Sequence, residues 1–112
     1  MTRYLISFDD GAMTFPDEDL LDVAKAAHEV VEKAKDAGVW VFGAGVEGHE
    51  ASVVGTDGSV TDGPSPESQA RIGGFTVVDV SSRKEALTWA AEIAVACRCA
   101  QDVRELLPDA PA

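Results

Sequence analysis

Two side chains in this sequence, His28 and Asp62, are of the types that move protons in enzymes. An imidazole titrates near neutral pH, so a histidine at the rim of a site can act as a general acid or base. A carboxylate can orient that imidazole, which makes Asp62 the natural partner and predicts a catalytic His28–Asp62 pair. In the alternative interpretation, His28 is an ordinary packed or surface residue in the middle of a helix.

A second histidine, His49, stands between Glu47 and a predicted strand. An exposed loop histidine is the simpler interpretation. The alternative is a site that His28, His49, Glu47 and Asp62 share, because two histidines with carboxylates form a common metal-ligand set. No local spacing motif such as His-Glu-x-x-His supports it. We therefore predict no metal and no cofactor.

The longest irregular segment runs from Val60 to Phe75 and leads into the most strand-like run of the chain. Asp62-Gly63-Pro64 is a turn signal, and Ser65 or Ser68 could cap a short helical turn. The Gly73-Gly74 pair lets the backbone approach another group closely. Ordered loops on rigid strands often carry binding groups, although this loop could also be a plain connection. We predict that a substrate contacts Ser7, His49, Ser65, Glu67 and Gln69.

Other nucleophile and cofactor patterns are weak. Cys97-Arg98-Cys99 has no second cysteine pair to complete a tetrahedral metal site, so structural or surface thiols are expected. The serines lack a nucleophile-elbow pattern. Gly43-Ala44-Gly45 is not a dinucleotide fingerprint, because its third glycine is misplaced and no helix follows.

The composition indicates one soluble domain of 112 residues, of which 46% are hydrophobic. The formal net charge of −11 argues against a nucleic acid or an anionic membrane as the partner, since both would repel the chain. No apolar run approaches the roughly 20 residues of a membrane span. The N-terminal apolar run is too short for a signal peptide. We therefore expect a cytoplasmic protein.

Apolar periodicity and turn residues define the elements that must position these side chains. Helices are predicted from Pro16 to about Gly38 and from Ser82 to about Cys97. Ser82 and Glu85 have the spacing of a capping box. Thr56-Asp57-Gly58-Ser59 predicts a hairpin turn, after which Val60 and Thr61 pair back briefly. Strands are predicted over residues 3–8, 39–42, 51–54, 75–80 and 101–107, with a bulge where the second strand ends at Gly43 to Gly48.

This order predicts an α+β fold, the ferredoxin-like βαββαβ sandwich. Two helices can cover only one face of a four-stranded sheet. Val39 to Phe42 and Phe75 to Val80 are nevertheless apolar at successive positions, as in strands covered on both sides. We therefore expect a homodimer that pairs through the open sheet faces.

The chain also resembles a known family. Asp62-Gly63-Pro64, the acidic Glu67 and Gly73-Gly74-Phe75 before a strand are similar to the signature of the YCII-related family, in its DGPF subgroup. Ala37-Gly38-Val39, Ala86-Leu87-Thr88-Trp89-Ala90 and Asp102-Val103-Arg104 extend the likeness over residues 1–107. That range is expected to be one domain, and 108–112 a tail.

The resemblance implies a dimeric α+β barrel with a pocket between helix and sheet. It also implies a histidine with an acidic residue as the catalytic pair in some members, and His28 falls where part of the family has a histidine. Ser65 replaces the phenylalanine of Asp-Gly-Pro-Phe, and Gln69 replaces a usual lysine. An acidic residue of the pattern is likewise replaced by Ala70 or Arg71. The side chains of this loop thus differ in part from those of the family pattern.

Two functions remain open. The first is a small cofactor-independent lyase or isomerase that acts on a small cyclic or unsaturated metabolite through His28 and Asp62. The second is a non-catalytic ligand-binding or regulatory dimer, accessory to a transcription system with a sigma factor, as the family's frequent neighbours suggest. The second predicts no close histidine–carboxylate pair, and the departures from the family pattern favour it. The enzyme is the first expectation and the regulatory dimer is the alternative.

Overall fold

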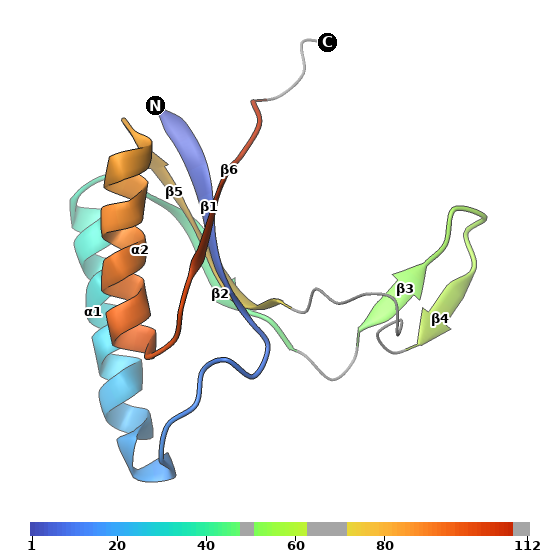
Figure 1. Cartoon of the computed structure of the whole chain (residues 1–112), viewed down its shortest axis with the longest axis horizontal. Coiled ribbons are helices and arrows are strands. Elements are labelled where there is room, and N and C mark those ends of the chain that lie inside the picture. Colours follow the sequence, from blue (N-terminus) through green and yellow to red (C-terminus); the bar gives the residue numbers. More distant parts are fainter. Residues whose placement is uncertain (48–50, 63–71, 109–112) are drawn as a thin grey trace.

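The computed structural model describes residues 1–47, 51–62 and 72–108. A four-stranded antiparallel sheet carries two helices, and a separate two-stranded hairpin stands away from it (Figure 1). The elements follow one another as β1 (Thr2–Asp9), η1 (Asp17–Asp19), α1 (Leu20–Asp36), β2 (Trp40–Gly45), β3 (Ser52–Val54), β4 (Val60–Asp62), β5 (Ile72–Val80), α2 (Arg83–Cys97) and β6 (Asp102–Glu105).

The strand order β2-β5-β1-β6 is that of the ferredoxin-like fold, which confirms the predicted fold class. Both helices lie on the same side of the sheet (Figure 1). Tyr4 and Ile6 of β1 and Val78 and Val80 of β5 point to that side and join the core. Their sequence neighbours face the other side, because side chains alternate along a strand. No helix or strand of the described residues covers that second face, which we call the open sheet face.

Helix α1 begins after a short 3-10 turn, so its regular part starts later than the sequence predicts. It ends before Gly38, which has a φ of +75° and supplies the left-handed stop that the sequence indicates. Val23 and Ala34 are its buried residues. These two residues of the predicted apolar face pack inwards, whereas Leu20 and Ala24, which the same spacing places on that face, are exposed.

Helix α2 begins at the predicted cap. Ser82 Oγ accepts a hydrogen bond from the Glu85 backbone N–H at 3.2 Å. The Glu85 carboxylate accepts from the N–H and hydroxyl of Ser81 rather than from Ser82, and these bonds lower its pKa. At the other end, Arg98 adopts a left-handed φ of 57° and its guanidinium bonds Asp19 at 2.7 Å. This ion pair joins the end of α2 to the start of α1.

The strand boundaries differ from the prediction at three places. β5 begins at Ile72, three residues early, because pairing with the end of β1 extends it through Gly73 and Gly74. β2 continues to Gly45 instead of ending at Phe42, and its irregularity lies between Trp40 and Phe42 rather than in the predicted range of Gly43 to Gly48. β6 is shorter than predicted. The Asp57-Gly58 hairpin forms as expected, whereas the predicted turn around Ser65 and Ser68 and residues 109–112 of the predicted tail lie outside the described residues.

Candidate functional site

A largely apolar pocket of about 340 Å³ lies between the helices and the sheet. Ala27, Val30, Val31 and Ala34 of α1 form one wall. Ile93, Ala96 and Cys97 of α2 form the opposite wall. Phe8, Trp40, Gly43, Ala44, Gly45, Phe75 and Thr76 supply the sheet side, and Gln101 closes the end.

Small residues leave this space open. Alanines at 27, 34 and 96 face the pocket where larger side chains would fill it. Gly43 lies so close to its neighbours that a Cβ there would stand 2.8 Å from the Trp40 ring and 2.9 Å from the Phe75 carbonyl oxygen. Glycine at this position therefore lets the indole of Trp40 lie against β2.

The glycine pair before Phe75 also permits a close approach, as predicted. A Cβ on Gly74 would stand 2.6 Å from the Phe8 ring, and a Cβ on Gly73 would stand 2.9 Å from the same ring. The Phe8 ring thus packs directly on the β5 backbone. Because Phe8 also lines the pocket, the glycine pair shapes the pocket floor.

Among the described residues that line the pocket, Trp40, Thr76, Cys97 and Gln101 have a polar group in their side chains. The Gln101 amide nitrogen donates to the Cys99 carbonyl oxygen at 3.4 Å and lies 3.5 Å from its sulfur. Burial raises the pKa of the Cys97 thiol, and the nearby Cys99 adds to this effect. Burial likewise raises the pKa of Cys99. Both cysteines are free and stay protonated at neutral pH, so the pocket wall offers a weak hydrogen-bond donor and not a thiolate.

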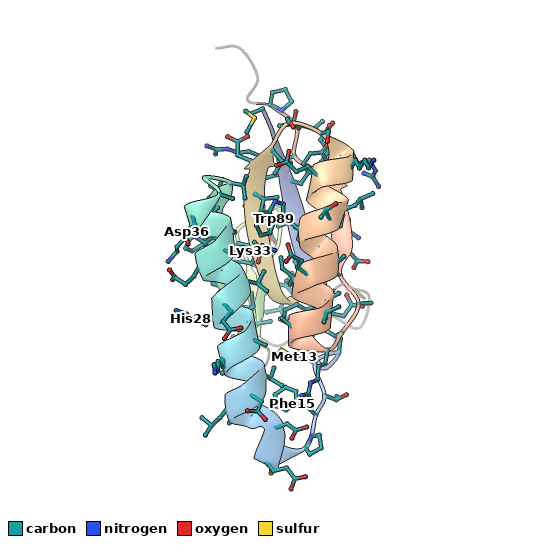
Figure 2. All side chains as sticks on the ribbon, turned by 90° about the vertical axis from the view of Figure 1, so that its left-hand side faces the viewer. Met13, Phe15, His28, Lys33, Asp36 and Trp89 are labelled. Atoms are coloured by element: carbon teal, nitrogen blue, oxygen red, sulfur yellow. The ribbon has the colours of Figure 1, made fainter. Side chains whose placement is uncertain are left out.

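His28 lies on the exposed part of α1, on the flank turned away from α2 (Figure 2). Its side chain is 72% exposed, and its Nε2 is 3.8 Å from the Glu32 carboxylate one turn later. Asp62 ends β4 and is exposed, and its carboxylate accepts a weak hydrogen bond from the Ser52 hydroxyl at 3.5 Å. Within the described chain, no hydrogen bond or ion pair joins His28 to Asp62, and neither residue lines the pocket.

Of the predicted substrate contacts, Ser7 is described and is buried in β1, with 4% of its surface exposed. It stands opposite Phe75 of β5 and Asp102 of β6. By alternation along β1, it points to the open sheet face and not to the pocket. His49, Ser65, Glu67 and Gln69 lie outside the described residues.

Residues 1–47, 51–62 and 72–108 contain no group of three or more histidine, cysteine or acidic side chains placed to hold a metal ion. No helix in this part of the chain is long and apolar enough to cross a membrane.

The sequence did not point to the residues that line the pocket, namely Phe8, Trp40, Thr76 and Gln101. Phe8 and Trp40 are aromatic, as in an ordinary core, and Thr76 and Gln101 are of types that are common at protein surfaces. The available signal was the run of alanines on both helices facing Gly43, because small residues on facing elements leave unfilled volume.

Comparisons with known proteins agree with this architecture. The sequence model of the YCII-related domain matches residues 2–107, so the chain belongs to the YCII-related family. No curated protein matches the sequence. Among solved structures, it is similar to the 5-chloro-2-hydroxyhydroquinone dehydrochlorinase of Burkholderia phenoliruptrix AC1100, solved in complex with 2,5-dihydroxybenzoquinone. The TM-score is 0.53 at 14% identity, over 96% of this chain and 94% of that chain.

Proposed function

We propose that this YCII-related chain binds a small, ring-containing, uncharged metabolite in the apolar pocket. The observation that carries the proposal is the pocket itself, whose walls are apolar and which offers the Thr76 hydroxyl and the Gln101 amide as hydrogen-bonding groups. Small-molecule sites commonly combine an apolar lining with a few polar groups that fix orientation.

Size and charge narrow the ligand class. A cavity of about 150 Å³ accommodates benzene, so about 340 Å³ suits one ring with several substituents. The described residues that line the pocket include no carboxylate, lysine, arginine or histidine. A charged ligand would lose its hydration there without gaining a partner of opposite charge. A neutral phenol, hydroquinone or unsaturated ring compound fits better.

The proposed assembly is a homodimer. Phe42 is 58% exposed on the open sheet face, and its ring lies 5.8 Å from that of Phe75. With Val77 and Leu5 they form an apolar strip that a second copy would cover. A two-fold axis would apply the same strip to both copies, as in most homodimers.

Filling the pocket tests the ligand site. Ala27→Leu places extra methyl groups in the pocket, and we expect it to weaken binding of hydroquinone or phenol at least tenfold in isothermal titration calorimetry. Ala24→Leu is the matched control, because Ala24 is exposed on the same helix. Ionised 2,5-dihydroxybenzoquinone should bind more weakly than hydroquinone. Equal affinity of the two leucine variants would place the ligand elsewhere.

The second candidate is a cofactor-independent lyase or isomerase. A dehydrochlorinase eliminates hydrogen chloride, and the likeness to one of known structure favours this class of chemistry. In this version His28 is the general base or acid and Asp62 its partner. In the described chain the carboxylate next to His28 belongs to Glu32. A His28–Asp62 pair would therefore require a different position of the hairpin that carries Asp62, or an Asp62 from a second copy.

The variant His28→Gln separates the two functions. If the chain is a lyase or isomerase of this kind, turnover of a bound ring compound should fall at least a hundredfold while affinity stays within about twofold. Unchanged turnover would remove His28 from the mechanism. Absence of turnover in the wild-type protein, together with ligand binding, favours a ligand-responsive regulatory dimer, for which a sigma-factor system is the proposed partner.

A further inference from the structure

The hairpin of residues 51–62, β3 with β4, has no support from the rest of the fold. Among the helices and strands of the described chain, β3 and β4 contact only each other. Every residue from 51 to 62 is exposed. We call this segment the hairpin arm.

The arm is nevertheless well formed internally. Its turn has Gly58 at a φ of +85°, and the Gly55 N–H donates to the Ser59 carbonyl at 2.7 Å. The Asp57 carboxylate accepts from the Ser59 N–H at 2.9 Å, and bonds from Ser59 lower the pKa of that carboxyl. The arm is thus well ordered by its own hydrogen bonds, although no helix or strand of the main sheet in the described chain contacts it.

The arm has one apolar side. Val54 and Val60 are paired directly across the two strands, and each is about two thirds exposed, at 65% and 64%. Val53 pairs with Thr61 on the opposite side of the hairpin. A two-stranded hairpin alone is at best marginally stable in water, so burying this valine pair against another surface would stabilise the arm.

The position of the arm indicates where that surface lies. Figure 1 places the helices on one side of the four-stranded sheet and the hairpin arm on the other. The arm therefore flanks the open sheet face. There Phe42, Val77 and Leu5 form one row across β2, β5 and β1, and Arg104 of β6 ends the row.

The surface area of the chain is large for its mass. A compact protein of 11.7 kDa exposes roughly 5,900 Å², whereas this chain exposes 7848 Å². The radius of gyration is 15.9 Å, against about 13 Å for a compact domain of this length. The open sheet face and the hairpin arm, every residue of which is exposed, both contribute to this excess of roughly 2,000 Å².

Charge is compatible with a second copy at this face. On the open sheet face Arg3 stands opposite Asp79, and Arg104 is 3.9 Å from Asp102. Each pair is neutral, although the chain has a net charge of −11. Residues 51–62 carry two aspartates and no lysine or arginine. Because Asp79 and Asp102 balance Arg3 and Arg104, the two aspartates of the arm meet no excess of negative charge at these positions.

We propose that the open sheet faces of two copies pack against each other and that the hairpin arm of each copy binds to the other copy. Val54 and Val60 make the apolar contact of the arm. The inference depends on the proposed homodimer and adds to it a specific swapped element. Each copy gives one arm and receives one. The same two-fold contact thus covers the open sheet face and the valine pair of the hairpin arm.

Sedimentation equilibrium of the full-length chain tests the arm. The double variant Val54→Thr, Val60→Thr keeps β-branched side chains but makes them polar, and we expect it to raise the dimer dissociation constant about tenfold. Val53→Thr, on the other side of the arm, should change it less than threefold. A dimer that is equally tight in all three proteins overturns the arm contact and leaves the sheet-face dimer standing.

A cross-link provides a readout that does not depend on how well the variants fold. A photo-reactive phenylalanine analogue at position 54, in a mixture of 14N- and 15N-labelled chains, should give mixed-isotope dimers linked to a peptide of the second copy. Links within one chain only would overturn the inference. A wild-type protein that is monomeric at 100 µM would overturn the arm and the homodimer together, whereas ligand titration of that monomer would test the pocket separately.

Discussion

Replacing Gly43 by alanine is expected to lower the free energy of unfolding by about 1–3 kcal/mol, whereas the same change at Gly45 is expected to be nearly neutral. Both glycines belong to β2 and line the pocket. A Cβ on Gly43 would approach the Trp40 ring to 2.8 Å and the Phe75 carbonyl oxygen to 2.9 Å. A Cβ on Gly45 would meet nothing within 4 Å.

The cost at Gly43 arises because one of the two obstacles is backbone. The Trp40 ring can rotate away, but the Phe75 carbonyl belongs to the neighbouring strand and cannot move without disturbing the ladder between β2 and β5. Movement of Trp40 would also narrow the pocket, so ligand affinity should fall with stability. Urea unfolding and hydroquinone titration of both variants measure the two effects. Equal stability of the two variants would show that β2 shifts freely at this point.

The elements were largely predictable because their signals are local. Ser82 caps α2, Gly38 ends α1, and Asp57-Gly58 makes the hairpin turn as the sequence indicates. β5 was predicted too short because glycine has a low strand propensity. Pairing with Phe8 and Asp9 of β1 nevertheless holds Gly74 and Ile72 in the sheet. Such pairing is a tertiary effect that the local sequence does not carry.

The site was less predictable, for two physical reasons. The alanines of α1 and α2 fit the inward face of any packed helix, and only the spacing between the two helices and the sheet leaves them around a cavity. His28 follows Ala27 directly, and one residue is a rotation of about 100° around a helix. Ala27 therefore faces the pocket, while the histidine beside it faces solvent next to Glu32.

The Asp62 prediction depended on the long loop folding back towards α1. Asp62 instead ends β4, and the element that carries it contacts no helix. A single sequence shows that an acidic residue precedes a turn. It does not show in which direction a hairpin projects from the main sheet. The open sheet face was predictable from composition, since apolar residues at successive positions of β5 exceed what one helical layer can cover.

Truncation of Trp89 is expected to cost about 3–5 kcal/mol of folding free energy, a large part of the roughly 5–15 kcal/mol that holds such a domain together. Trp89 is 8% exposed and belongs to the core between the helices and the sheet. The Lys33 ammonium lies 5.8 Å from the centre of its ring and bonds Glu92 of α2 at 2.5 Å. Figure 2 shows Trp89 and Lys33 in the space between the two helices.

The indole thus packs in the core and also lies beneath the Lys33 ammonium. The variants Trp89→Ala and Trp89→Phe separate these two contacts. Phenylalanine keeps most of the buried area and an aromatic face beneath the ammonium, so it should lose clearly less stability than alanine. The exposed Lys33–Glu92 pair contributes little by itself, and Lys33→Met should therefore stay within about 1 kcal/mol of the wild type. Urea unfolding followed by far-UV circular dichroism gives all three values. A loss below 1 kcal/mol for Trp89→Ala would mean that the alanines around the pocket let the helices collapse into the vacated volume, and the ligand affinity of that variant would then disappear.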